Sequence, residues 1–337
     1  MSRNILVTHA DAPIGRRLLK ALYYDDRVDR IFAVGAGPPP GSFDRYLASP
    51  QQRVAYARVD LARHRSVHDL FHSERLRDTR IDSVIHLPAH GPREDGPPQL
   101  AGLAQRTAEA RLLLHHCVEQ PTIRRLVVLG SAFVYRLVPG NANRLTEASD
   151  LDLSPDVPAE TRAWIDCDML FHGEIHNDNL DVTLLRSATV VASGGFVFMN
   201  PSFDETTGRC MRPLGYDPMC ALISDKDVVR ALILASYSDV SGIFNIAGRE
   251  AMPLSRLAEW TSRGQLALPG PVFSGMSRML RLARGQRAHS AIGGIQQRYG
   301  FTLDTSRARR ELGFRPVYRI GRSRDGDGRL RLETARA

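Results

Sequence analysis

The sequence of 337 residues predicts an α/β fold, in which a doubly wound parallel sheet is followed by a smaller C-terminal α/β lobe. Short apolar runs rich in β-branched residues recur along residues 1–187 with helical patterns between them, as in strands buried on both faces. Beyond Ser187 this alternation stops, and segments containing glycine and proline take its place. We therefore expect a core over residues 1–187, a mixed core and smaller lobe over 188–316, and a mobile tail over 317–337.

The expected strands and helices alternate in the order of repeated βαβ units. Strands are expected at Asn4–Thr8, Arg30–Val34, Val54–Val59, Ser83–Leu87, Arg125–Leu129 and Val182–Leu185. Helices are expected between them at Ile14–Tyr24, Ser66–Phe71, Leu100–Val118 and Arg162–His176. In the lobe we expect a helix that starts near Asp225, a strand at Gly242–Ile246, and helices at Leu254–Trp260 and Ser274–Arg284.

The charge of the chain comes almost wholly from arginine. Its net charge is +8 and its pI about 9.7, although the only lysines are Lys20 and Lys226. The arginines are spread through helices and loops, and the densest run, Arg319–Arg331, is interrupted by acids and glycines. We therefore expect a solvated surface and no nucleic-acid groove. A basic amphipathic helix at Met276–Arg287 leaves binding to a membrane surface open as a weaker alternative.

Neither a membrane span nor a leader is predicted. The most apolar stretch, Val182–Met199, contains Arg186 and a Gly194-Gly195 break, and no charged-then-apolar segment opens the sequence. The four cysteines are scattered without close pairing, which is typical of a reduced compartment. We therefore expect a cytoplasmic protein.

The first expected strand ends in a turn that leads into a helix, where backbone N–H groups could bind a dinucleotide pyrophosphate. Of the three glycines usual in such a turn, only Gly15 is present. His9 stands at the first position, where a side chain at positive φ costs about 1 to 2 kcal/mol. Ala12 stands where a glycine lets the backbone approach phosphate, and Pro13 removes an N–H that could donate to it.

This turn and several later segments resemble the extended short-chain dehydrogenase/reductase superfamily, in particular the NAD-dependent epimerase/dehydratase family that includes UDP-glucose 4-epimerase-like proteins. The order and spacing of the segments together carry the resemblance, which covers most of the chain. The matching segments are Thr8–Leu19, Asp60-Leu61, Val84–Ala89, Leu129–Tyr135, Asp181–Ala188, Asp225–Val229, Phe244–Gly248 and Asp304–Pro316.

The resemblance implies a Rossmann-type core over residues 1–187 that binds NAD or NADP, and a substrate lobe within 188–316 for a nucleotide-sugar-like ligand. It also implies a homodimer in which Leu100–Val118 and Arg162–His176 form a helix bundle. The residues that it places at the cofactor are His9, Ala12, Pro13, Ile14, Gly15, Asp60, Leu61, Leu87, Pro88 and Ala89.

The end of the second expected strand leaves the kind of nucleotide open. Gly35 stands where an NAD-preferring member has an acid for the ribose hydroxyls. The loss of that acid, with Arg16 and Arg17 nearby, is compatible with NADP and equally with no dinucleotide at all.

The family's chemistry needs a Tyr-x-x-x-Lys pair, in which the phenol is the acid/base and the ammonium lowers its pKa. Neither lysine of this chain has a tyrosine four residues before it. Aligning the expected helix Arg162–His176 with the family's helix places Trp164 at the tyrosine and Asp168 at the lysine. Ser131 falls on the family's catalytic serine or threonine. We predict that Ser131 can bind a ligand oxygen and that the family's usual hydride chemistry is lost.

Two further groups of side chains were weighed as functional sites. His172 and His176 are four residues apart, the spacing of a helical zinc pair, but no third ligand is evident, and we expect no metal. Asp166, Cys167 and Asp168 could supply a replacement acid or nucleophile, although acids in the first part of a helix are common without any catalytic role.

Three functions remain open from the sequence. The first is an NAD(P)-binding protein of epimerase/dehydratase type with a nucleotide-sugar-like or other small ligand; an active form would be an NAD(P)-dependent oxidoreductase or epimerase with a non-standard acid/base. The second is a pseudoenzyme, a ligand sensor or assembly subunit that keeps the fold and binds no dinucleotide. The third and weakest is basic surface binding to membrane or nucleic acid.

Overall fold

The computed structural model describes residues 2–88, 100–138, 140, 144–155, 157, 159–192, 195–196, 209–260, 264–269, 300–324 and 330–336. Two predicted helices lie outside these residues: the lobe helix at Ser274–Arg284 and the basic amphipathic helix at Met276–Arg287. Among the residues described, no helix has the length and apolar character needed to cross a bilayer.

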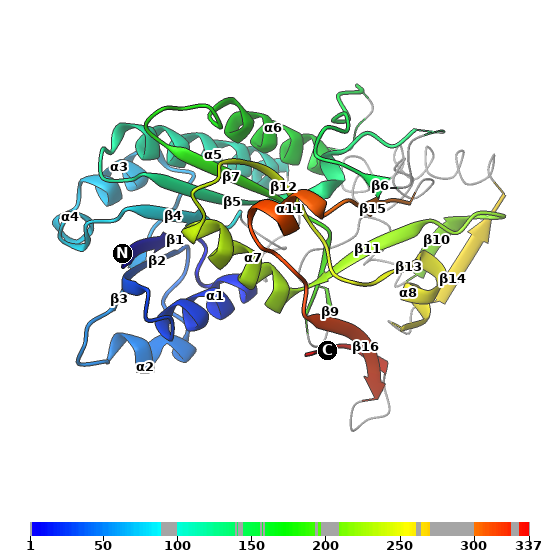
Figure 1. Ribbon diagram of the computed structural model, residues 1–337, viewed down its shortest axis with the longest axis horizontal. Helices are drawn as coiled ribbons and strands as arrows, with labels where there is room; N and C mark the ends of the chain where they lie inside the picture. Colours follow the sequence, from blue (N-terminus) through cyan, green and yellow to red (C-terminus); the bar gives the residue numbers. More distant parts are fainter. Residues whose placement is uncertain are drawn as a thin grey trace.

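A seven-stranded parallel sheet forms the centre of the molecule (Figure 1). Its strand order is β12-β7-β5-β4-β1-β2-β3, and every neighbouring pair in it is parallel. The strands are β1 (Arg3–Val7), β2 (Val28–Gly35), β3 (Val54–Arg58), β4 (Ser83–His86), β5 (Arg125–Ser131), β7 (Asp181–Ser187) and β12 (Gly242–Ile246). The predicted doubly wound α/β fold is confirmed, and each expected strand lies within a few residues of its predicted bounds.

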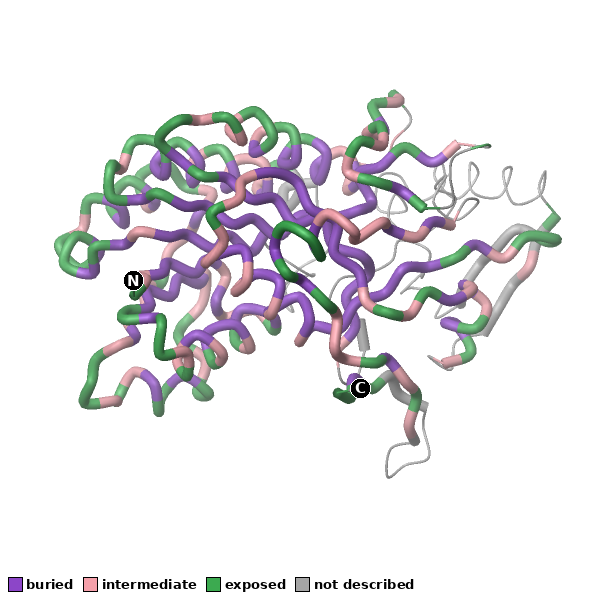
Figure 2. The backbone as a smooth tube through the Cα atoms, viewed as in Figure 1, coloured by how far each residue is buried: buried purple, intermediate pink, exposed green. Residues whose placement is uncertain are grey.

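Helices cover both faces of this sheet (Figure 1). One face carries α1 (Pro13–Tyr23), α2 (Asp44–Leu47) and α7 (Asp225–Tyr237), and the other carries α3 (His64–His72), α4 (Glu74–Thr79), α5 (Leu100–Glu119) and α6 (Ala159–Gly173). Because successive side chains of a strand point to opposite faces, Ile5 and Val7 join the core under α1 while Leu6 joins the core under α3. Apart from the edge strand β3, in which only Val54 is buried, the strands are buried along most of their length (Figure 2), as their continuous apolar runs predicted.

The C-terminal lobe is built from short strands at the carboxyl side of the sheet (Figure 1). A four-stranded sheet has the order β13-β11-β8-β9, and two smaller sheets pair β10 with β14 and β6 with β15. The bounds are β6 (Arg144–Leu145), β8 (Thr189–Ala192), β9 (Gly195–Phe196), β10 (Arg209–Pro213), β11 (Met219–Ser224), β13 (Ala251–Pro253), β14 (Gly264–Leu268), β15 (Thr302–Leu303), α8 (Leu254–Trp260) and α11 (Ser306–Glu311). The expected helix at Leu254–Trp260 coincides with α8.

The tail that the sequence predicted to be mobile contains paired strands. β16 (Tyr318–Arg324) and β17 (Leu330–Arg336) form an antiparallel ladder. The carboxylate of Asp227, fully buried in α7, accepts hydrogen bonds from the N–H groups of Val317 at 2.9 Å and Tyr318 at 3.0 Å. These two bonds join the start of β16 to a helix about ninety residues earlier, a contact that apolar periodicity does not reveal.

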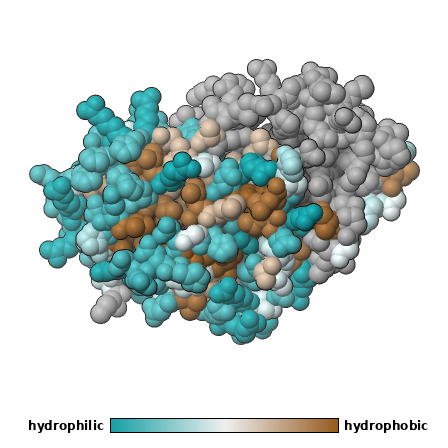
Figure 3. All heavy atoms as spheres, turned by 90° about the horizontal axis from the view of Figure 1, so that it is seen from above, coloured by the Kyte–Doolittle hydropathy of each residue, from teal (hydrophilic) through white to brown (hydrophobic). Residues whose placement is uncertain are grey.

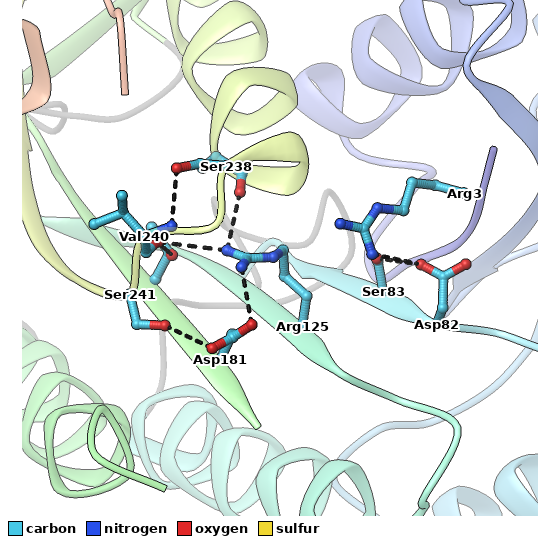
Figure 4. A network of polar contacts seen from close by, with 10 residues as sticks. Arg3, Asp82, Ser83, Arg125, Asp181, Ser238, Val240 and Ser241 are labelled. Carbon is cyan, nitrogen blue, oxygen red and sulfur yellow. Dashed lines mark hydrogen bonds and ion pairs between the residues drawn. The ribbon is translucent and has the colours of Figure 1, made fainter. Parts of the chain in front are cut away.

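A buried guanidinium joins strands of the sheet at their amino-terminal ends (Figure 4). Arg125, at the start of β5 and 2% exposed, donates to the Asp181 carboxylate of β7 at 3.0 Å and to the carbonyls of Ala235 and Val240 at 3.4 Å. Burial lowers the pKa of Arg125. This network joins β5 and β7 to the end of α7. It lies at the amino-terminal ends of the strands, whereas the β1–α1 turn follows the carboxyl end of β1, so we assign the network a structural role.

Candidate functional site

The turn between β1 and α1 places a non-glycine residue in a backbone conformation that favours glycine. His9 has φ of +46°, the left-handed conformation that favours glycine. The Ala12 N–H donates to the His9 carbonyl at 3.0 Å and closes the turn. The first bond of α1 runs from the N–H of Arg16 to the carbonyl of Ala12, so Pro13 in the first turn costs the helix no bond.

Gly15 is kept for a steric reason. A Cβ at this position would lie 2.6 Å from the Cα of Ala10 and would also collide with the carbonyl oxygen of His9. Real side chains do not approach backbone so closely, so α1 can pack against the turn only with glycine here. The structure therefore gives a steric reason for a glycine at this position.

The side chain of His9 reaches a partner that the sequence did not reveal. Its Nε2 lies 2.9 Å from Oε2 of Glu109 on α5, and Glu109 is only 2% exposed. The other carboxylate oxygen of Glu109 accepts from the side-chain amide of Gln105 at 2.9 Å. A hydrogen bond to a carboxylate is among the stronger kinds, so it offsets part of the strain at His9. No local motif could have indicated a contact across one hundred residues.

At the end of β2, side chains of the loop and of β3 pack against Gly35. A Cβ on Gly35 would lie 2.6 Å from Cγ of Asp11 and would also collide with the hydroxyl of Tyr56. Asp11 accepts a hydrogen bond from the N–H of Gly37 at 3.2 Å, and the Tyr56 hydroxyl donates to the Gly37 carbonyl at 2.8 Å. Burial, with the nearby Asp11 carboxylate, raises the pKa of Tyr56 to about 12. The sequence did not identify Asp11 or Tyr56 as site residues.

The two arginines of the loop point in different directions. Arg16 is exposed, and its Nε donates to the backbone carbonyl of Asp11 at 2.6 Å. Arg17 instead pairs with Asp225 at the start of α7, at 2.7 Å. Arg16 therefore contacts the backbone of the β1–α1 turn, whereas Arg17 is directed toward α7.

Four of the remaining predicted cofactor residues, Asp60, Leu61, Leu87 and Pro88, follow the carboxyl ends of β3 and β4. Leu87 is 1% exposed and exchanges hydrogen bonds with the Thr8 hydroxyl, its N–H donating at 3.0 Å. Leu61 is buried in the core under α3. Asp60 accepts from the N–H of Ala62 at 3.1 Å and holds the turn that precedes α3. Pro88 borders the cavity described below, Ile14 is buried in α1, and Ala89 lies outside the described residues.

The two positions aligned with catalytic residues on β5 and α6 are both buried. Ser131, 1% exposed, ends β5, and its Oγ accepts from the N–H of Phe133 at 3.2 Å, which caps the short 3₁₀ helix η2 (Ala132–Val134). Trp164 lies on α6 and is 7% exposed. An indole has no proton that titrates near neutral pH, so Trp164 cannot serve as an acid/base.

Asp168, at the position aligned with the lysine, is held in a closed ion pair. Its two oxygens accept from Nε and Nη2 of Arg186 on β7 at 2.8 and 2.7 Å, and both side chains are 2% exposed. The guanidinium lies 4.8 Å from the ring centroid of Tyr135, whose hydroxyl donates to Asn245 at 2.6 Å. Burial alone would lower the pKa of Arg186, but the bonds and charge of Asp168 raise it above its usual value. The arrangement is that of a neutralised structural pair.

A cavity of about 10 Å³ lies between α6 and strands β4, β5 and β7, with Trp164 and Asp168 in its wall. This volume is about that of one water-sized sphere. Cys167 also borders it, and burial raises the pKa of that thiol to about 11, so it is protonated at neutral pH. Asp166, the other replacement that the sequence suggested, is exposed on the outer side of α6. Neither residue has the setting of a catalytic nucleophile.

The predicted helix that carries His172 and His176 is shorter than expected. α6 ends at Gly173, so the two histidines do not share a helical face. Within the described ranges, no three histidine, cysteine, aspartate or glutamate side chains are placed to hold a metal ion.

Comparison with known proteins places the fold. No family model matches the chain. Uncharacterized proteins of Mycobacterium tuberculosis and Mycobacterium bovis are 26% identical over 330 residues, covering 93% of this chain and 80% of theirs. UDP-glucuronic acid 4-epimerase from Bacillus cereus, solved with UDP-glucuronic acid and NAD, has a TM-score of 0.64 at 17% identity and covers 93% of each chain. The dTDP-glucose 4,6-dehydratase DesIV from Streptomyces venezuelae, with NAD and TYD bound, has a TM-score of 0.64 at 19% identity, covering 96% and 94%.

The chain has the Rossmann-type fold of these epimerases and dehydratases. The dTDP-glucose 4,6-dehydratase from Bacillus anthracis, solved with NAD, agrees at a TM-score of 0.63, 13% identity, and coverage of 94% and 92%. At such identities the similarity establishes architecture, whereas function has to be argued from the residues at the site.

Proposed function

We propose that this protein binds a dinucleotide at the β1–α1 turn, together with a nucleotide-sugar-like ligand, and that it no longer carries out tyrosine–lysine hydride chemistry. The structural neighbours that support the first part were solved with NAD, and two of them with further ligands that include UDP-glucuronic acid. NAD or NADP would supply a hydride acceptor or donor when bound. These ligands are those of the neighbours. For this chain, the proposal rests on its own residues.

The turn fits a pyrophosphate in its backbone. His9 is in the left-handed conformation, Gly15 permits the close packing of α1, and the N–H groups of Ile14 and Gly15 belong to the first turn, which has no intrahelical acceptors. The positive end of the helix dipole favours an anion there. Ala12 and Pro13 reduce the number of close donors, so we expect weaker binding than in a turn with all three glycines.

The observation that carries the second part is the Asp168–Arg186 pair. The family's mechanism needs a cation beside a phenol, and this chain has a carboxylate bound to a buried guanidinium beside an indole. Such a pair is already neutralised and cannot lower the pKa of a neighbouring acid. Ser131 remains able to position a ligand oxygen, but that serine alone supplies no proton acceptor near pH 7.

The decisive experiment is calorimetric titration of the purified protein with NAD⁺, NADH, NADP⁺ and NADPH, after mass spectrometry for a co-purifying nucleotide. We expect at least one to bind in the micromolar range, about 8 kcal/mol, and no turnover with nucleotide-sugars. Failure of all four to bind would contradict the proposal and favour the sensor or assembly subunit without a dinucleotide.

We also propose a homodimer formed through α5 and α6. Figure 3 shows apolar residues gathered along the middle of the face that carries these helices, and Met169 of α6 and Val118 of α5 are 50% and 38% exposed. Light scattering should give twice the chain mass for the wild type and a single mass for Met169→Glu. Leu153→Glu, at an exposed position outside both helices, is the control and should stay dimeric.

A further inference from the structure

The carboxylate of Asp11 lies where the acid at the end of β2 would project. Its Cγ and Oδ1 are 2.6 and 2.7 Å from the position that a Cβ on Gly35 would take. An acidic side chain at Gly35 and the observed side chain of Asp11 cannot be present together, since they would fill the same space. The absence of a side chain at Gly35 therefore leaves the space that the Asp11 carboxylate occupies.

Asp11 is held in this place by the backbone of the following segment. Oδ2 accepts from the N–H of Gly37 at 3.2 Å, and the Gly37 carbonyl is in turn bound by the Tyr56 hydroxyl at 2.8 Å. Asp11 is only partly buried, so its carboxylate remains within reach of a ligand. A carboxylate that is fixed at one oxygen is well prepared to accept hydrogen bonds at the other.

In Rossmann folds an acid near the end of the second strand accepts hydrogen bonds from the ribose hydroxyls of NAD and disfavours the 2′-phosphate of NADP. We propose that Asp11 takes over this role from the β1–α1 loop and makes the site select a dinucleotide with a free 2′-hydroxyl. This inference rests on the proposed function, because it concerns the same nucleotide site.

The charges around Asp11 predict how its neutralisation would change the nucleotide preference. Arg16 and Arg58 are exposed on this side of the molecule, and their Nε atoms donate to the carbonyls of Asp11 and Ala36 at 2.6 and 3.1 Å. These guanidiniums would attract a 2′-phosphate if no carboxylate lay between the loop and the strand. Neutralising Asp11 should therefore weaken NAD⁺ binding and at the same time strengthen NADP⁺ binding.

The test is the ratio of dissociation constants for NADP⁺ and NAD⁺ in Asp11→Asn, measured by calorimetry. The loss of one charge-assisted hydrogen bond should lower this ratio on the order of tenfold to a hundredfold. Asp69→Asn, which removes an acid that is 67% exposed on α3, is the matched control and should leave the ratio unchanged. A variant with Asp11→Gly, Gly35→Asp and Tyr56→Phe moves the acid to β2, removes both clashing groups, and should regain the NAD⁺ preference that Asp11→Gly alone loses.

The outcomes separate this inference from the proposed function. If the wild type binds none of the four nucleotides, the proposed function fails and the inference fails with it. If the wild type binds NAD⁺ but Asp11→Asn leaves the ratio unchanged, or lowers both affinities equally, Asp11 only supports the Gly37 turn and the inference alone is overturned. A wild type that prefers NADP⁺ overturns it as well.

Discussion

The β1–α1 turn and the α6–β7 contact both depart from the family pattern that the sequence resembles, but with opposite consequences. In the turn, His9 adopts the left-handed conformation that favours glycine, and Gly15 permits the close packing of α1. At α6, the helix is in place, yet its aligned positions now hold Trp164 and Asp168 in a buried setting. A site made by backbone survives side-chain replacement if the chain can still adopt the shape, whereas a site made by side chains does not.

The largest effect should come from breaking the α6–β7 pair. Asp168→Asn leaves the guanidinium of Arg186 buried without its counter-charge, and we expect a loss of about 3 to 5 kcal/mol in the free energy of unfolding. Urea denaturation measures this loss. Asp166→Asn, on the exposed side of the same helix, should change stability by less than about 0.5 kcal/mol. Equal losses in the two variants would show that the ion pair does not hold α6 to β7.

The steric role of Gly15 comes next. Gly15→Ala places a Cβ 2.6 Å from the Cα of Ala10, and we expect a loss of about 1 to 3 kcal/mol together with loss of nucleotide binding. Thermal unfolding and calorimetry measure the two effects. Gly173→Ala is the control, because nothing lies within 4 Å of the added Cβ. A turn that tolerates Gly15→Ala as well as that control would contradict the close packing of α1.

The third effect concerns the hydrogen bond between His9 and Glu109, which should stabilise the strained turn. His9→Gly removes the strain at φ of +46° but also leaves Glu109 buried without this partner. A double-mutant cycle with Glu109→Gln should give a coupling energy of about 1 to 2 kcal/mol, with His9→Gly less harmful in the Glu109→Gln background. A coupling energy near zero would mean that His9 tolerates its conformation without help from α5.

The smallest effect concerns pH at the end of β2. The pKa of Tyr56 is raised from 10.0 to about 12, so the folded state holds this proton more tightly than the unfolded state. The resulting stability is present below pH 10 and is lost between pH 10 and about 12. Tyr56 is half-buried, and solvent screens part of its interactions, so we expect less than about 1 kcal/mol by pH 11. Tyr56→Phe should lose less stability over this range than the wild type, and an identical slope in both would contradict the assignment.

Local patterns were sufficient where one segment of chain sets the structure. The alternation of apolar strands and helices predicted the sheet and both layers, and the turn before α1 was found from Gly15 and its neighbours. The contacts that define the candidate site were not predictable in this way. Glu109 meets His9 across 100 residues, and buried Asp227 of α7 accepts hydrogen bonds from Val317 and Tyr318 at the start of β16.

The sequence by itself determined the fold, the position of the β1–α1 turn and the absence of a Tyr-x-x-x-Lys pair, because period, turn chemistry and residue identity are local properties. Only the tertiary structure decided that Asp168 neutralises Arg186 and that Asp11 fills the space beside Gly35. Both depend on which strand lies next to which helix or loop. The sheet brings together charges that are distant along the chain, and burial there determines which of them must pair.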